Sequence, residues 1–307
     1  SAASDVYKRQ SMTLTLAESS AHNIGRTDGY SVDVIGVSAQ KALIAVRGSE
    51  DSELYHVSTD SDGESHSLSS ALTYLSSVNS HSFLLKLTSL ESYLFYVDSS
   101  DDTLYGRRVD TSGTNPSFGG SAVTISSDVR SNSSSNRSST PVIATHLYDG
   151  LCLIIYTSTD DLYGYMRLVN LQSASVGSAV LYSDTPFTSG RWYDYLASSD
   201  DNSQAKIIYS SVSFGGPTYT IDVSISGATL TPSSPVLRDF TSAYGVITYL
   251  NSNYYASCQG VGGSGEAVVF GSGAALKVLG ASISKGLGDT LYLTAWGDND
   301  ELIYQVR

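Results

Sequence analysis

Apolar or alternating runs recur along the chain, each followed by a short polar turn and a second run that contains an aromatic residue. In several of them the turn is acidic, as in YVDSSDDTLYG and IIYTSTDDLYG. Two such runs joined by a polar turn are typical of a β-hairpin. The pattern therefore predicts hairpins at residues 43–56, 93–106, 151–164, 207–220, 254–270 and 291–304.

A further strand is predicted before each hairpin, at residues 33–38, 83–88, 141–147, 193–198, 244–250 and 282–287. Another is predicted after each of the first five hairpins, at residues 65–70, 122–127, 178–183, 228–232 and 275–280. The hairpins start 50, 58, 56, 47 and 37 residues apart. Four-stranded units that repeat every ~40–50 residues are the sequence pattern of a β-propeller, in which each unit forms one blade.

The last unit ends at Arg307 without an outer strand, whereas residues 12–18 (MTLTLAE) alternate and have no hairpin partner. Pairing this segment into the last blade would close the ring and remove its open edges. We therefore predict an all-β, six-bladed β-propeller over residues 12–307, as a single domain whose last blade is closed by an N-terminal strand. A β-sandwich pair, a β-solenoid and a propeller of five or seven blades are the alternatives. Residues 1–11 lack both an apolar stretch and alternation, and we interpret them as a non-native or disordered leader.

Composition narrows the classes of partner. Hydrophobic residues make up 41% of the chain, enough for a sizeable core, and the net charge of -13 disfavours nucleic acid and anionic membrane surfaces. No apolar run approaches the ~20 residues that a membrane-spanning helix needs, so membrane insertion is not expected. Cys152 and Cys258 lie in apolar strand patterns and predict neither a disulfide framework nor a metal site. Glycosylation sequons at Asn132 and Asn136 are compatible with secretion, and we predict an extracellular protein.

Arginine marks one set of loops. In a propeller the outer-to-inner loops, which lead from one blade to the next, share a face with the hairpin turns. Five of the eleven arginines fall in these loops, and three of them closely precede aromatic residues. Converging guanidinium groups beside aromatic walls could bind an anion or a glycan, whereas pairing with nearby loop acids is the structural alternative. The predicted ligand-binding residues are Arg26, Tyr30, Arg137, Arg191, Trp192, Tyr193 and Arg238.

Acidic turns on the same face have two interpretations. Pairs such as Asp101-Asp102 and Asp160-Asp161 could bind calcium, but Asp is also an ordinary turn residue that bonds to its own backbone. No ordered calcium-loop spacing is present, so we expect no cofactor and no metal site, with calcium as the alternative. The segment STDSDG (58–63) resembles the Asp-box turn of sialidases, with one inserted residue and no Trp after it. A Gly-containing hairpin turn is the simpler interpretation.

Three functions follow from this architecture. The predicted fold resembles that of six-bladed fungal and bacterial lectins, and the resemblance implies Arg and aromatic side chains in pockets between blades. We therefore predict a non-enzymatic recognition module that binds a glycan or a protein partner. A structural subunit of an extracellular or ciliary assembly is one alternative. A sialidase-like glycosidase is the other, and that resemblance implies Asp28 as the acid and Tyr30 or Tyr193 as the nucleophile. The sequence contains no nucleophile elbow, histidine metal cluster or phosphate loop.

Overall fold

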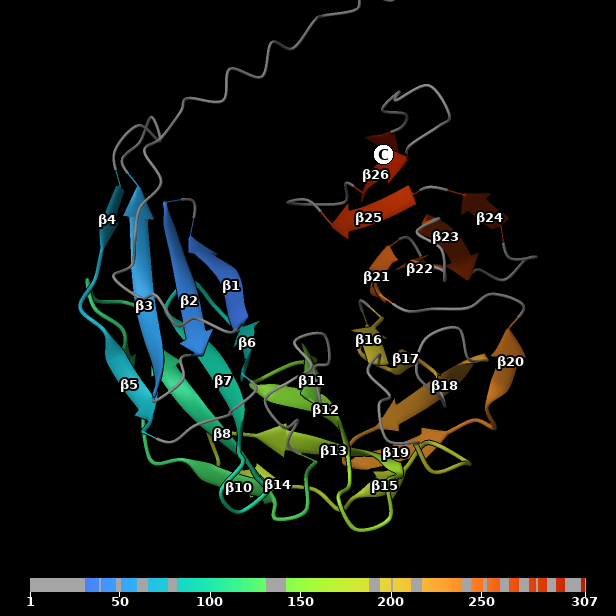
Figure 1. The fold of residues 1–307 in the computed structure, drawn as a ribbon, viewed down its shortest axis with the longest axis horizontal. Coiled ribbons are helices and arrows are strands. Elements are labelled where there is room, and N and C mark those ends of the chain that lie inside the picture. Colours follow the sequence, from blue (N-terminus) through green and yellow to red (C-terminus); the bar gives the residue numbers. More distant parts are fainter. Residues whose placement is uncertain are drawn as a thin grey trace, which may run out of the picture.

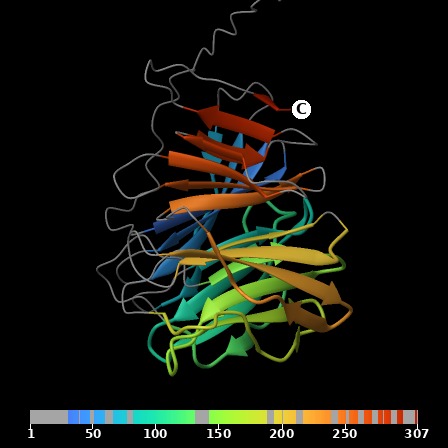
Figure 2. The same cartoon turned by 90° about the vertical axis from the view of Figure 1, so that its right-hand side faces the viewer.

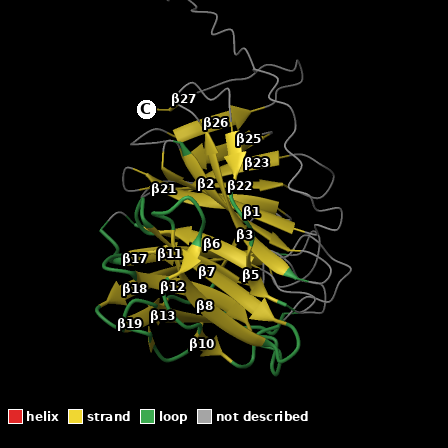
Figure 3. Cartoon of the chain, turned by 90° about the vertical axis from the view of Figure 1, so that its left-hand side faces the viewer, coloured by secondary structure: helices red, strands yellow, loops and turns green. Residues whose placement is uncertain are grey.

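The structure is a computed structural model. It describes residues 31–38, 40–47, 51–59, 66–76, 82–130, 142–187, 194–199, 201–210 and 217–238, together with the strands between 244 and 306. Every regular element in these ranges is a β-strand (Figure 3). The strands form separate antiparallel sheets that follow one another around an arc (Figure 1). The all-β prediction is therefore confirmed.

The first sheet contains β1 (Ser31–Ser38), β2 (Lys41–Arg47), β3 (Ser52–Thr59), β4 (His66–Leu68) and β5 (Leu72–Leu75). The second contains β6 (Ser82–Lys86), β7 (Glu91–Asp98), β8 (Thr103–Asp110), β9 (Ser117–Phe118) and β10 (Val123–Ser126). The third contains β11 (Val142–His146), β12 (Leu151–Thr157), β13 (Gly164–Asn170), β14 (Ser175–Val176) and β15 (Val180–Leu181).

The fourth sheet contains β16 (Asp194–Ser198), β17 (Gln204–Ser210), β18 (Thr218–Ser226), β19 (Thr229–Pro232) and β20 (Val236–Arg238). The fifth contains β21 (Tyr244–Leu250), β22 (Asn253–Gln259), β23 (Gly265–Phe270) and β24 (Leu276–Leu279). The sixth contains β25 (Ala281–Lys285), β26 (Leu291–Ala295) and β27 (Gln305–Val306). In Figure 2 the fifth and sixth sheets, in orange and red, lie above the fourth.

The first strand of each sheet lies toward the middle of the arc. Each of the first five predicted hairpins forms the second and third strands of one sheet, and each strand predicted before a hairpin is the innermost strand. In the sixth sheet the first half of the predicted hairpin is β26, but the described third strand, β27, lies just beyond the predicted end at residue 304. The innermost strands β1, β6, β11, β16, β21 and β25 pack in that order, each beside the next. The order of elements predicted from the sequence is therefore confirmed over the described strands.

The hydrophobic core lies between neighbouring sheets, because the middle strands are buried on both faces. In β7, Tyr93 and Phe95 pack toward the third sheet, whereas Leu94 and Tyr96 pack toward the first. Alternate residues of one strand point to opposite faces, so a strand with both faces covered reads as a continuous apolar run. Residues 93–97 and 151–156 are such runs, which is why the hairpins stand out in the sequence.

The outer strand differs from the prediction, since in the first four sheets it is divided into two short strands that pair with the same neighbour. In the first sheet the break falls at Ser69, whose N–H donates to the carbonyl of His56 (2.9 Å) and whose hydroxyl accepts from the N–H of His56 (2.8 Å). Ser233 makes the same pair of bonds with Asp222 in the fourth sheet. Short, interrupted edges protect an exposed sheet edge from pairing with other chains.

The alignment of the second and third hairpins is also corrected. The sequence matches Leu104-Tyr105-Gly106 with Leu162-Tyr163-Gly164, a spacing of 58 residues. In the structure, Tyr105 pairs with Tyr96 and Tyr165 pairs with Tyr156, a spacing of 60. The two turns have the same length, because Ser158 and Tyr163 close the third turn where Asp98 and Thr103 close the second. Leu162 therefore corresponds to Asp102, and both have a positive φ, of 63° and 53°. A shift of two residues leaves the inward and outward positions unchanged, so alternation did not reveal it.

Ring closure stays a prediction. Residues 12–18, which we expect to complete the last blade, and the leader at 1–11 both lie outside the described residues. The sixth sheet is described with three strands, of which the third spans only two residues.

Candidate functional site

Most of the predicted loop residues lie outside the described part of the chain, namely Arg26, Tyr30, Arg137, Arg191, Trp192 and Tyr193. Arg238 is described, at the end of β20, where its Nε donates to the Thr220 hydroxyl at 2.7 Å. This bond holds Arg238 against its own sheet. The convergence of the predicted arginines into one site therefore stays a prediction.

The face that was expected to bear the site does exist. Asp128, in the loop from the second to the third sheet, accepts hydrogen bonds from the hydroxyl of Ser158 (2.7 Å) and the N–H groups of Thr159 (2.8 Å) and Asp160 (3.1 Å). These three residues begin the β12–β13 turn, which spans residues 158–163. One outer-to-inner loop is thus tied to the hairpin turn of the next sheet, so the two kinds of loop share one face here.

The acidic turns bond within themselves. Asp101 accepts from the N–H of Thr103 (3.0 Å) and the hydroxyl of Tyr105 (3.2 Å). Asp161 accepts in the same way from the N–H of Tyr163 (3.0 Å) and the hydroxyl of Tyr165 (2.6 Å). In these two turns the carboxylates serve as turn residues, as the structural interpretation expects. The described residues contain no cluster of three or more His, Cys, Asp or Glu side chains that could hold a metal ion.

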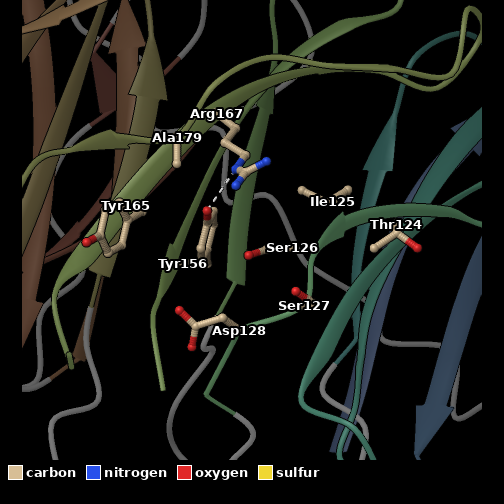
Figure 4. Close-up of a pocket in the computed structure, with 9 residues that line it drawn as sticks. All are labelled: Thr124, Ile125, Ser126, Ser127, Asp128, Tyr156, Tyr165, Arg167 and Ala179. Atoms are coloured by element: carbon tan, nitrogen blue, oxygen red, sulfur yellow. Dashed lines mark hydrogen bonds between the residues drawn. The ribbon is translucent and has the colours of Figure 1, made fainter. Parts of the chain in front are cut away.

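A cavity of about 370 Å³ opens between the second and third sheets (Figure 4). The second sheet contributes residues 124–128, at the end of β10 and the start of the following loop. The third contributes Tyr156, Tyr165, Arg167 and Ala179. The cavity lies beside the Asp128 contact, at the rim of the face that bears the turns.

A difference between repeats accounts for this space. A bulge in the outer strand places Tyr74 in the first sheet, and the same position holds Ile125 in the second. Tyr74 packs on Tyr96 of the next sheet, with ring centroids 5.4 Å apart. In the third sheet Tyr182 follows the corresponding pair of residues and packs on Tyr209 of the fourth sheet at 5.7 Å.

Between the second and third sheets, therefore, an isoleucine stands where two other seams have an aromatic ring. Both Tyr156 and Tyr165 line the cavity beside the shorter Ile125 side chain, and of the two only Tyr165 is partly exposed. These two rings stack on each other, with centroids 6.1 Å apart and planes at 24°. Equivalent stacked pairs, Tyr96–Tyr105 and Tyr209–Tyr219, occur in the second and fourth sheets.

The polar groups of the cavity are held in place by their neighbours. The Arg167 Nε donates to the Tyr156 hydroxyl at 2.8 Å, and within the described part of the chain this is the only hydrogen bond of that guanidinium. In Figure 4 its terminal nitrogens lie on the side of the cavity where Ile125 and Ser126 stand. The hydrogen bond to Asp161 raises the pKa of Tyr165 to about 12, so this hydroxyl remains protonated and its ring is fixed.

The sequence analysis placed the ligand-binding residues in loops, whereas the aromatic rings and the guanidinium of the cavity come from strand residues. Tyr156, Tyr165 and Arg167 belong to the β12–β13 hairpin, and Tyr156 is also part of the hydrophobic core, where it is 2% exposed. A detectable signal was present, because the bulge position reads Tyr, Ile, Tyr over three successive repeats. Seeing it requires the pairing register, because Ile125 and Tyr182 are 57 residues apart whereas the hairpin strands of these two sheets are 60 apart.

No helix long and apolar enough to cross a membrane occurs in the part of the chain that the structure describes. No protein-family model matches the chain, and no curated protein matches it.

Solved structures do resemble this one. Hydrazine synthase of Kuenenia stuttgartiensis matches with a TM-score of 0.55 and 8% identity, over 86% of this chain and 73% of that chain. Sqt1 of Saccharomyces cerevisiae matches with a TM-score of 0.55 and 10% identity, over 91% and 72% of the two chains. The Dos1 propeller matches with a TM-score of 0.53 and 11% identity, over 90% and 69%. Identity this low shows the fold alone, and together with the antiparallel sheets it shows that the chain is a β-propeller.

Proposed function

We propose that this protein is a non-enzymatic recognition module: a six-bladed, extracellular β-propeller closed by residues 12–18, which binds a glycan or a protein partner without a cofactor. Binding takes place on the face that bears the hairpin turns and the outer-to-inner loops. The propeller fold supports the proposal, because propellers serve as binding scaffolds. Fold alone does not decide function, however, since the neighbours with the same fold include an enzyme.

The observation that carries the proposal is the cavity at the rim of this face. It combines tyrosine rings, a guanidinium and several hydroxyl groups, which are the groups that recognition sites use to contact sugars and protein side chains. Its acid is already engaged, since Asp128 accepts three hydrogen bonds from the β12–β13 turn. The described part of the cavity is therefore better suited to binding than to proton transfer.

A glycan array tests the proposal, with capture from an extracellular-protein library as the second arm. We expect binding without turnover by the wild-type protein, and weaker binding by Arg191→Ala and Trp192→Ala. Arg107→Ala is the matched control, because this arginine lies over the Phe118 ring at 3.5 Å, within the second sheet, and belongs to no outer-to-inner loop. The proposal fails if neither a glycan nor a protein binds, or if a glycan is hydrolysed. The loop assignment fails if all four proteins bind equally.

A further inference from the structure

We infer that the cavity between the second and third sheets is a binding pocket for a single uncharged sugar residue, with Ile125 as the residue that keeps it open. This inference rests on the proposed recognition function and deepens it, since it names a site and a chemical class of ligand.

Shape is the first argument. The first-to-second and third-to-fourth seams are filled by Tyr74 and Tyr182, which pack on tyrosines of the following sheet. At Ile125 the corresponding ring is missing, and a space of about 370 Å³ remains beside stacked tyrosines. A pyranose is a six-membered ring of similar breadth, and although it is a puckered chair, its C–H groups form an apolar patch on one face, so it fits a site from which a phenol ring is absent. The volume lies at the small end of ligand pockets, which favours one sugar residue over an extended ligand.

The hydrogen-bonding groups are the second argument. The hydroxyls of Thr124, Ser126 and Ser127 make no hydrogen bond within the described part of the chain. The terminal nitrogens of Arg167 are available in the same sense, while its Nε is fixed by Tyr156. Every sugar hydroxyl is both a donor and an acceptor, and this wall offers donors from the guanidinium and both functions from serine and threonine. Adjacent hydroxyls of one sugar can therefore be satisfied together.

Charge is the third argument, and it decides between a neutral and an acidic sugar. The positive Arg167 and the negative Asp128 line the same cavity, so the site has no excess positive charge. The chain as a whole carries a net charge of -13, which lowers the local concentration of anions. A carboxylate ligand would find no net positive charge in the cavity and would be repelled by the negative charge of the chain. Neither effect acts on an uncharged sugar.

Titration calorimetry and saturation-transfer NMR test the inference, with glucose, galactose, mannose, fucose, N-acetylglucosamine and sialic acid as separate probes. We expect at least one neutral sugar to bind. Ile125→Tyr should restore the ring present in the other seams, fill the cavity and weaken binding by tenfold or more. Arg167→Met keeps the aliphatic stem but removes the donors, and should also weaken binding about tenfold, a loss of ~1.4 kcal/mol.

Ile125→Val is the matched control for the first variant, because it leaves the cavity open and should bind as the wild type does. Thermal melts establish that each variant is folded, and Arg167→Met carries the test if Ile125→Tyr does not fold. The inference is overturned if no neutral sugar binds, if sialic acid alone binds, or if a folded Ile125→Tyr protein binds as tightly as the wild type. If Ile125→Tyr binds as tightly as the wild type and the glycan array is positive, the pocket assignment is rejected but the proposed recognition function is retained. Sugar binding in the cavity with equal array binding by the loop variants instead rejects the loop assignment alone.

Discussion

His56 is the position where a single substitution is expected to stabilise the protein. The side chain is 1% exposed, and neither ring nitrogen makes a hydrogen bond of normal geometry with a described residue, although the backbone of Gly113 and Thr114 lies near enough to interact with the ring. In β3 it lies opposite Leu43, and the corresponding pair in the third sheet is Leu153 and Leu168. The repeat itself therefore shows that two leucines fit this site. His56→Leu would give the first sheet the same Leu–Leu pair that the third sheet already has.

The size of the effect follows from the unpaired nitrogens. A buried polar group without a partner costs ~1–3 kcal/mol, and leucine removes this cost while adding apolar contact with Leu43. We expect the free energy of unfolding at pH 8 to rise by ~1–3 kcal/mol. In a chain of this length each kcal/mol raises the melting temperature by about 2 °C.

The effect also depends on pH. Burial, and then the charge of Lys41, lower the pKa of His56 below its usual 6.5, although the backbone of Thr114 and Gly113 acts in the opposite direction. Below pH 6.5 the unfolded chain consequently binds a proton that the folded protein does not. Wild-type stability is complete above pH 6.5 and falls as the pH drops through the lowered pKa, by at most ~1.4 kcal/mol per pH unit for this group. The advantage of His56→Leu should therefore grow at low pH.

Urea unfolding at pH 8 and at pH 5 measures both terms. His56→Gln is the matched control, since glutamine cannot titrate but still buries a polar group. The free energy of unfolding of His56→Gln should therefore not fall as the wild-type value does between pH 8 and pH 5. At pH 8 this variant should not show the increase expected for His56→Leu. A His56→Leu protein that is less stable than the wild type at pH 8, or whose advantage is the same at both pH values, would refute the reasoning.

Three further predictions concern a loop carboxylate, a turn glycine and a buried thiol. Asp128→Ala should lower the free energy of unfolding by ~2 kcal/mol, because three hydrogen bonds to the next turn are lost, and Asp128→Asn by less, since its oxygen still accepts from two N–H groups. Gly150→Ala should lower the free energy of unfolding, measured in urea, by ~1–3 kcal/mol, because the φ of Gly150 is +72° and a Cβ there would overlap two neighbouring side chains. Gly36→Ala is the control and should lower it less, because open space surrounds Gly36. In a Cys258→Ser background, Cys152 should react with a thiol reagent only as fast as the protein opens, because its side chain is fully buried and burial raises its pKa.

The element order was readable from the sequence for a physical reason. Strands buried on both faces are continuous apolar runs, and β7 and β12 can be recognised in the sequence for this reason. The outer strands carry less information, because an edge strand is buried on one side only and each half spans a few residues. The two-part outer strand is set by backbone bonds at small residues such as Ser69 and Gly119, and a small residue in a polar stretch is compatible with a turn as well as with a break.

The candidate site was harder to predict, because its signal is a deviation and not a motif. Sequence reasoning looked for groups that bear chemistry and found arginines in loops. The cavity instead depends on Ile125, an ordinary core residue whose importance lies in what the equivalent positions contain. Tyr74 and Tyr182 close their seams by packing at an angle against a tyrosine ring of the next blade, and the absence of one such ring at Ile125 leaves the space. In a repeat protein, equivalent positions of successive blades can be compared directly. A candidate site can then be located where the side chain in one blade differs from its equivalents in the others. The same logic explains why the pairing register must be known first. The hairpin strands of the second and third sheets are offset by 60 residues, but Ile125 and Tyr182 in the outer strands are only 57 apart, so no single spacing aligns both. A uniform spacing of 58 compares Ile125 with Ser183, and the contrast with Tyr182 disappears.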